Sequence, residues 1–169
     1  MHNLYIKAVV FFLSILLGAC TTQSLSTQEK ELPSFLTVIS KVNYGDSGIA
    51  TFKIENNSNQ KKVYIYHPEE VDIEKKTKDG WKKVDILYCP CGASCPPPPE
   101  QRVIVPGGTV TKSWNLKSQW CEGTNLHGQI PETKTQYAGK GSYRFVFRYR
   151  LKENSEIKTY FENFNLKEQ

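Results

Sequence analysis

Cysteines are the residues of this chain whose types and spacing best suit specific chemistry. Cys89, Cys91 and Cys95 are separated by one and three residues, four prolines follow them, and Cys121 lies further along. Thiols at such short spacings can pair as disulfides or bind a soft cation such as zinc or Cu(I) as thiolates. The spacing is not a common zinc-ribbon or zinc-finger spacing, and no Cys-x-x-Cys of the thioredoxin type is present.

A fifth cysteine, Cys20, ends a segment with the order of a secretory signal. Lys7 precedes an apolar run from Ala8 to Leu17, and the small residues Gly18 and Ala19 follow. This order resembles the signal of bacterial lipoproteins, the lipobox. The resemblance implies cleavage before Cys20, a diacylglycerol on its sulfur and a fatty acid such as palmitate on its new amino group. The apolar run has about half of the ~20 residues that a membrane-spanning helix needs.

The lipobox resemblance also implies a location and a domain order. We expect a helical signal peptide at residues 1–19, a flexible polar tether at 20–33 and one domain at 34–169. The mature chain keeps 150 of the 169 residues, enough for a domain with a real core. The protein is expected in the cell envelope, bound to the membrane through its N-terminal lipid. Thr21, in place of an aspartate, favours the outer membrane if the host has two membranes.

Export places the four remaining thiols in an oxidising compartment, which favours disulfides over free cysteines. Four cysteines allow three pairings. Cys89 and Cys91 are poorly placed to bond each other, because side chains two apart in an extended chain must bend sharply to meet. The favoured interpretation is that Cys91–Cys95 closes a small loop and that Cys89–Cys121 ties this loop to a later one. The longer bridge would contribute about 3–4 kcal/mol on the chain-entropy model.

Metal binding is the alternative for the same four cysteines. As thiolates, Cys89, Cys91, Cys95 and Cys121 could supply a complete ligand set for Zn²⁺ or Cu(I). His67 and His127 are the other soft ligand candidates of the mature chain. No other cofactor is expected.

Candidate catalytic residues are few. His67 ends a predicted strand, and His127 lies in a long loop near Glu122. The sequence has no Gly-x-Ser-x-Gly, no phosphate loop and no His-Glu-x-x-His. Glu69 and Glu70 are adjacent in the sequence, and this pattern favours two turn residues over a paired general acid and base. We therefore expect no enzyme and no catalytic residue, but a binding or structural module.

The charge of the chain is modest and spread out. The formal net charge is +5, and it falls to +4 when Lys7 leaves with the signal. Basic residues are scattered over predicted strands and turns, and no helix-turn-helix, zinc-finger or RNA-recognition pattern occurs. Nucleic acid is therefore not an expected partner. An envelope protein or a glycan is expected instead.

Alternation of apolar and polar residues predicts an all-β domain. Turn signals at Asn56–Asn59, Asp79–Gly80 and Pro106–Gly108 predict hairpins between the strands that flank them. Residues 119–141 lack clear periodicity and are expected to form a long loop with at most one short element. Eight or so strands without helical periodicity favour a two-sheet antiparallel β-sandwich of about seven to nine strands. The predicted strands are 35–42, 50–55, 62–66, 71–74, 81–84, 102–105, 109–114, 142–150 and 157–164.

The strongest predicted strand, 142–150, alternates aromatic residues with arginines. An inward face of a sandwich strand needs large apolar side chains at every second residue. We therefore assign Tyr143, Phe145, Phe147 and Tyr149 to the core, together with Trp114.

Three segments carry a resemblance to known domains: Phe52–Ser58, Val103–Val110 with Trp114, and Gly139–Phe145. Their order resembles the small immunoglobulin-like sandwich domains of bacterial lipoproteins and, more loosely, BsuPI-type proteinase-inhibitor domains. The resemblance implies an immunoglobulin-like sandwich over Leu36–Phe164 and, as an alternative role, insertion of the proline-rich loop into a protease. No functional residue is carried over from it.

Loop tips are the expected place of binding, because rigid sandwiches present ligand contacts there. The candidates are the loop Cys89–Pro99 and the loop Gln119–Tyr137. We expect both at one end of the domain, because Cys121 could join them.

Overall fold

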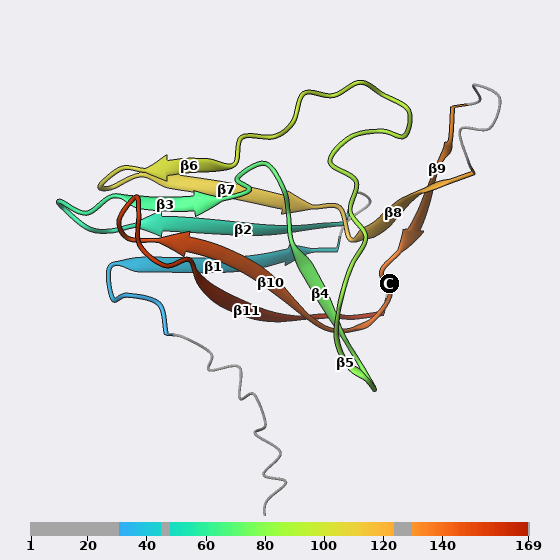
Figure 1. Cartoon of the computed structure of the whole chain (residues 1–169). Helices are drawn as coiled ribbons and strands as arrows, with labels where there is room; N and C mark the ends of the chain where they lie inside the picture. Colours follow the sequence, from blue (N-terminus) through green and yellow to red (C-terminus); the bar gives the residue numbers. More distant parts are fainter. Residues whose placement is uncertain (1–30, 45–47, 124–129, 169) are drawn as a thin grey trace, which may run out of the picture.

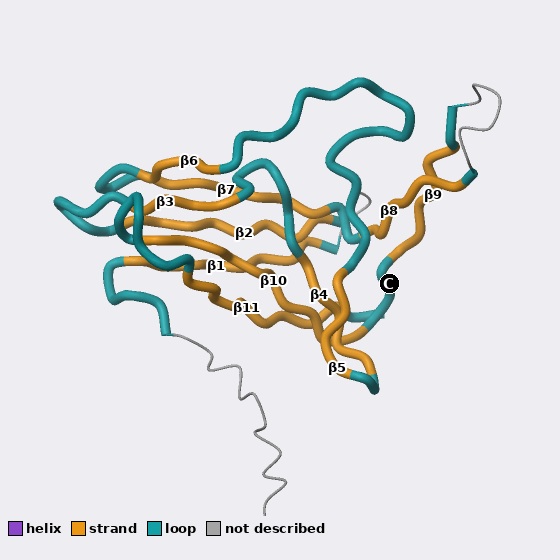
Figure 2. Tube along the Cα trace, viewed as in Figure 1, coloured by secondary structure: helices purple, strands orange, loops and turns teal. Residues whose placement is uncertain are grey.

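The protein is all-β, as the sequence predicts. The computed structural model describes residues 31–44, 48–123 and 130–168, which form eleven strands and no helix (Figures 1 and 2). The expected signal helix and Cys20 lie outside these residues. The strands are β1 Leu36–Asn43, β2 Ile49–Asn56, β3 Val63–Tyr66, β4 Ile73–Thr77, β5 Gly80–Lys83, β6 Gln101–Ile104, β7 Thr109–Trp114, β8 Lys117–Glu122, β9 Glu132–Tyr137, β10 Gly141–Arg150 and β11 Lys158–Leu166.

Two antiparallel sheets pack as a sandwich, and a hairpin extends from one end (Figure 1). The first sheet has the order β1-β2-β7. In the second sheet, β11 pairs along one edge of β10, while β3 and β4 pair in succession with its other edge. β6 and β5 lie outside β3 and β4. β8 and β9 pair only with each other.

The aromatic face of β10 forms the centre of the core, which confirms its assignment from the sequence. Tyr143, Phe145, Phe147 and Tyr149 are each at most 2% exposed. The Phe145 ring stacks on Phe52 of the opposite sheet, with 4.4 Å between ring centroids. Stacked aromatic side chains bury large apolar areas, so these contacts join the two layers. Trp114 is also buried, as predicted.

Two predicted hairpins are wrong. β2 pairs with β1 and β7, whereas β3 pairs with β6 and β10, so the Asn-rich turn carries the chain from one sheet to the other. The turn at Pro106–Gly108 does the same between β6 and β7. Alternation marks the inward face of a strand, but it does not identify the sheet to which the strand belongs. The predicted hairpin at Asp79–Gly80 is confirmed, since β4 pairs with β5.

The prediction of a long loop at residues 119–141 is also wrong, because β8 and β9 form a hairpin over most of this segment. No residue of these two strands is buried. A strand that buries neither face needs no apolar alternation, so the pattern gave no signal. This unpredicted hairpin brings the number of strands in the described residues to eleven, above the predicted seven to nine.

Asn56 holds the crossing from β2 to β3. Its side chain is fully buried, and Nδ2 lies 2.7 Å from the carbonyl oxygen of Lys61 and 3.1 Å from those of Ile104 and Val105. Its Oδ1 accepts a hydrogen bond from the Ser58 N–H. One amide therefore satisfies buried backbone groups at the place where both sheets exchange strands.

We expect Asn56→Leu to lower the free energy of unfolding by about 2–4 kcal/mol, because it leaves several buried carbonyl groups without a donor. Urea denaturation at constant m-value measures this loss. Asn57→Ala is the matched control: Asn57 is exposed, its Nδ2 bonds only the Thr37 hydroxyl, and its loss should cost less than about 0.5 kcal/mol. Equal losses in the two variants would contradict the role assigned to Asn56.

Candidate functional site

All four cysteines of the described chain form disulfides, but with a pairing that differs from the favoured interpretation. The bridges are Cys89–Cys95 and Cys91–Cys121, with Cα–Cα distances of 6.2 and 5.6 Å. The reason is a turn in which the Ala93 N–H donates to the Pro90 carbonyl. This turn brings Cys89 beside Cys95 and leaves Cys91 free to reach β8. Residue spacing alone does not reveal such a turn.

The longer bridge joins the two candidate loops at one end of the domain, as predicted. Beyond Cys91–Cys121, the Cys91 N–H lies 3.4 Å from the Thr133 hydroxyl of β9. Ile130 packs so closely on Gly92 that a Cβ atom there would lie 2.5 Å from its Cγ2. A bridge over 30 residues contributes about 3–4 kcal/mol on the chain-entropy model. It therefore fixes the β8–β9 hairpin, here called the arm, against the loop Cys89–Pro99, here called the cysteine loop.

The metal interpretation requires these cysteines to be reduced, and it stays a prediction. In the described residues, no group of three or more His, Cys, Asp or Glu side chains is placed to hold a metal ion. His67, one of the two other ligand candidates, lies with Nδ1 3.7 Å from a carboxylate oxygen of Glu70. The other, His127, lies outside the described residues.

An interruption between β3 and β4 shapes the side of the sandwich beside β7. Both strands pair with the same edge of β10, at Tyr149↔Ile65 and at Phe145↔Ile73. Between these two pairs β10 advances by four residues, whereas the chain that runs from β3 to β4 advances by eight. Residues 67–72 therefore belong to neither strand, and we call them the excursion. They include the predicted turn at Glu69 and Glu70, which is confirmed.

Lys112 of β7 holds the excursion from the opposite sheet. Its side chain is 8% exposed, and Nζ donates to the carbonyl oxygen of His67 at 2.9 Å and to that of Glu70. Burial lowers the pKa of Lys112 from 10.5 to about 8, although the nearby carboxylates of Glu70 and Asp72 oppose this shift. Lys112 is not among the site residues that the sequence predicts. Its inward position, between Val110 and Trp114 in the alternation, is the signal that could have indicated it.

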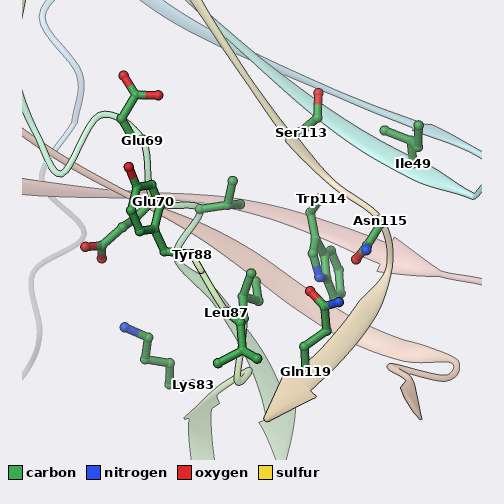
Figure 3. A pocket seen from close by; sticks show the side chains of 12 residues that line it. Ile49, Glu69, Glu70, Lys83, Leu87, Tyr88, Ser113, Trp114, Asn115 and Gln119 are labelled. Atoms are coloured by element: carbon green, nitrogen blue, oxygen red, sulfur yellow. The ribbon is translucent and has the colours of Figure 1, made fainter. Parts of the chain in front are cut away.

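A groove of about 450 Å³ lies between the excursion, the segment after β5 and the end of β7 (Figure 3). Its size is within the range of ligand sites in proteins. The lining combines apolar side chains with carboxylates, one lysine and two amides. These residues are Ile49, Glu69, Glu70, Val71, Lys83, Ile86, Leu87, Tyr88, Ser113, Trp114, Asn115 and Gln119.

The groove is held to the arm by backbone and side-chain contacts. The N–H of Gln119, at the base of the arm, donates to the Asp85 carbonyl at 2.8 Å. The Trp114 indole N–H donates to the Lys117 carbonyl at 2.9 Å. The cysteine loop begins directly after Tyr88, which is 46% exposed. The groove, cysteine loop and arm thus form one continuous end of the domain, which we call the stapled end.

The fold and this end define an all-β sandwich whose two disulfides hold a loop and an arm beside a groove. Comparison with known proteins finds no family model, no curated protein and no solved structure that matches the chain. Within the residues that the structure describes, no helix has the length and apolar character to cross a bilayer.

Lys112 predicts a specific pH dependence of stability. Below about pH 8 both the folded and the unfolded chain hold the Lys112 proton, and the cost of burying the charge is fully present. Between about pH 8 and 10.5 the folded chain has released this proton and the unfolded chain retains it, so stability rises with pH. Relative to Lys112→Met, the wild type should gain about 3 kcal/mol over this window.

Urea denaturation of both proteins from pH 7 to pH 10.5 measures this difference. The matched control is Lys62→Met, because Lys62 is exposed and its variant should follow the wild-type curve. Parallel curves for wild type and Lys112→Met would contradict the inferred release of the proton.

Proposed function

We propose that this is a lipid-anchored protein of the cell envelope whose β-sandwich is a non-catalytic binding module. The anchor is Cys20, on the resemblance of its surroundings to the lipobox, and the outer membrane is its place if the host has two membranes. The stapled end is the binding end. Its partner is an envelope protein or a glycan rather than nucleic acid.

The placement of the chain entry relative to the groove is the observation that carries this proposal. The Phe35 carbonyl accepts the Asn57 N–H at 2.7 Å, so the tether enters the domain where β2 crosses to β3. β7 runs from this end of its sheet to the opposite one (Figure 1), and Trp114 and Asn115 line the groove there. The six residues of β7 separate the two ends by roughly 20 Å. A lipid before the tether would therefore be attached at the end of the domain opposite the stapled end, which it leaves uncovered.

The polar groups around the groove support binding rather than catalysis, because they have structural partners. Glu69 pairs with Arg102 at 3.4 Å, and Glu70 lies near His67. The Asn115 side-chain oxygen accepts the Lys117 N–H at 3.2 Å. A few polar groups held in place beside apolar side chains are what fixes the orientation of a bound ligand.

Intact mass spectrometry of the protein from its host's membranes tests the anchor and the disulfides together. We expect a diacylglycerol and a fatty acid on Cys20, and alkylation of the other four cysteines only after reduction. Cys20→Ser should lose the lipid and the membrane association, whereas Thr21→Ser, the matched control, should keep both. An unmodified Cys20 would refute the anchor. Thiols that label without reduction would favour the metal alternative.

Protease inhibition is a second candidate function, favoured by the exposed cysteine loop. Residues 92–97 are all exposed, and both disulfides hold the loop. Prolines keep a chain extended, and a loop that is rigid before binding loses less entropy when it enters a protease. We expect the purified protein to inhibit at least one envelope protease, with loss of inhibition after reduction. Unchanged activity across a broad protease panel would refute this candidate.

A further inference from the structure

We infer that the open edge of β7 and the groove form one site for an extended peptide, which adds to the sheet β1-β2-β7 as a fourth strand. This inference rests on the proposed binding role and specifies its ligand class. The two features are independent: one is a row of backbone groups, and the other is a groove lined by side chains. They meet at Ser113, which belongs to the edge and also lines the groove.

The register of β2 and β7 shows which backbone groups are open. The Asn56 N–H donates to the Gly108 carbonyl, and the Gly107 N–H donates to the Asn56 carbonyl. Hydrogen-bonded pairs alternate along an antiparallel ladder, so Val110, Lys112 and Trp114 are the residues of β7 that bond β2. Thr109, Thr111 and Ser113 therefore direct their N–H and C=O groups away from β2. Their side chains are exposed, and within the described chain no other strand pairs with β7.

Edge strands in natural proteins are commonly protected by outward lysines, prolines or bulges. The only lysine of β7, Lys112, points inward, and Thr109, Thr111 and Ser113 present small hydroxyl side chains. β1, at the other edge of the same sheet, is different. Its Ser40 hydroxyl donates to Glu162 of β11 at 3.0 Å. This side-chain contact ties the β1 edge to the opposite sheet, whereas within the described chain no strand pairs with the β7 edge.

The groove supplies the specificity that an open edge lacks. Alternate side chains of a strand added beyond β7 would point inward on the same face as Lys112 and Trp114, towards the excursion. Figure 3 shows Ser113 and Trp114 across the groove from Glu69 and Leu87. The apolar lining suits an apolar inward side chain. The carboxylates of Glu69 and Glu70 at the rim already contact Arg102 and His67, and they favour a basic neighbour over an acidic one. The ligand class is an extended peptide with this pattern.

A peptide fits this edge better than a glycan does. The outward groups of Thr109, Thr111 and Ser113 repeat every second residue, at intervals of about 6.8 Å. Each of these residues offers one donor and one acceptor, which is the pattern that the backbone of another strand complements.

Selection of a random peptide library displayed on phage against the purified full-length protein tests this inference. A selected peptide of about ten residues is then synthesised, and its affinity is measured by fluorescence anisotropy for wild type, Thr111→Pro and Thr111→Val. Proline removes the outward N–H of Thr111 but no bond to β2, so we expect binding to weaken about tenfold or more. Valine keeps the N–H, and Thr111→Val should bind within about twofold of wild type.

Amide hydrogen exchange of the wild type keeps the test decisive if Thr111→Pro fails to fold. Saturating peptide should slow exchange at Thr109, Thr111 and Ser113, but not at Trp81 on the outer edge of β5. Three outcomes would overturn the inference: no enriched peptide, equal binding to Thr111→Pro, or protection elsewhere only. If the β7 amides become protected without peptide, and more so at higher protein concentration, the edge pairs with a second copy of the chain instead.

The two proposals fail separately. Loss of the peptide site, with a lipid still found on Cys20, would leave the anchored binding module in place with a different ligand. An unmodified Cys20 would refute the anchor and leave the peptide measurements unaffected.

Discussion

The buried ammonium of Lys112 is the contact on which the groove depends. It reaches from β7 to the carbonyl oxygens of His67 and Glu70 and so ties the excursion to the opposite sheet. Without this donor, the two part-buried carbonyl groups would lose their partner, at a cost of up to about 1–3 kcal/mol each. Burial of the charge is itself unfavourable, and the carboxylates of Glu70 and Asp72 offset part of that cost. The lysine therefore holds the excursion, which is one wall of the groove, in place, but the burial of its charge lowers the free energy of unfolding.

The groove and the open edge have one common origin in the sheet topology. The first sheet ends at β7 after three strands, whereas the second continues beyond that point through β6 and β5. The excursion and the segment Val84–Tyr88 cover part of the inner face that a fourth strand of the first sheet would cover. The space that remains is the groove, and the edge beside it is β7. The four-residue register shift along β10 is thus the structural cause of the candidate site.

Local and global signals in the sequence differ in what they could predict. The aromatic alternation of β10 and the Asp79–Gly80 turn are local, and both were interpreted correctly. The crossing at Asn56 depends on carbonyl groups of Ile104 and Val105, far along the chain, so the turn residues alone predict a hairpin instead. The disulfide pairing depends on one turn within the cysteine loop, and Lys112 acts on residues of the opposite sheet. None of these partners is visible in the residues next to the one concerned.

The disulfides take over the role that a hydrophobic core has elsewhere in the domain. No residue of β8 or β9 is buried, so packing alone cannot hold the arm against the sandwich. The Cys91–Cys121 bridge does so, and its strand leads directly to Gln119 and the groove wall. Lys112 restrains the opposite wall from inside the sandwich. A groove fixed from both sides loses little entropy when a ligand enters, which favours recognition by a preformed surface over folding on binding.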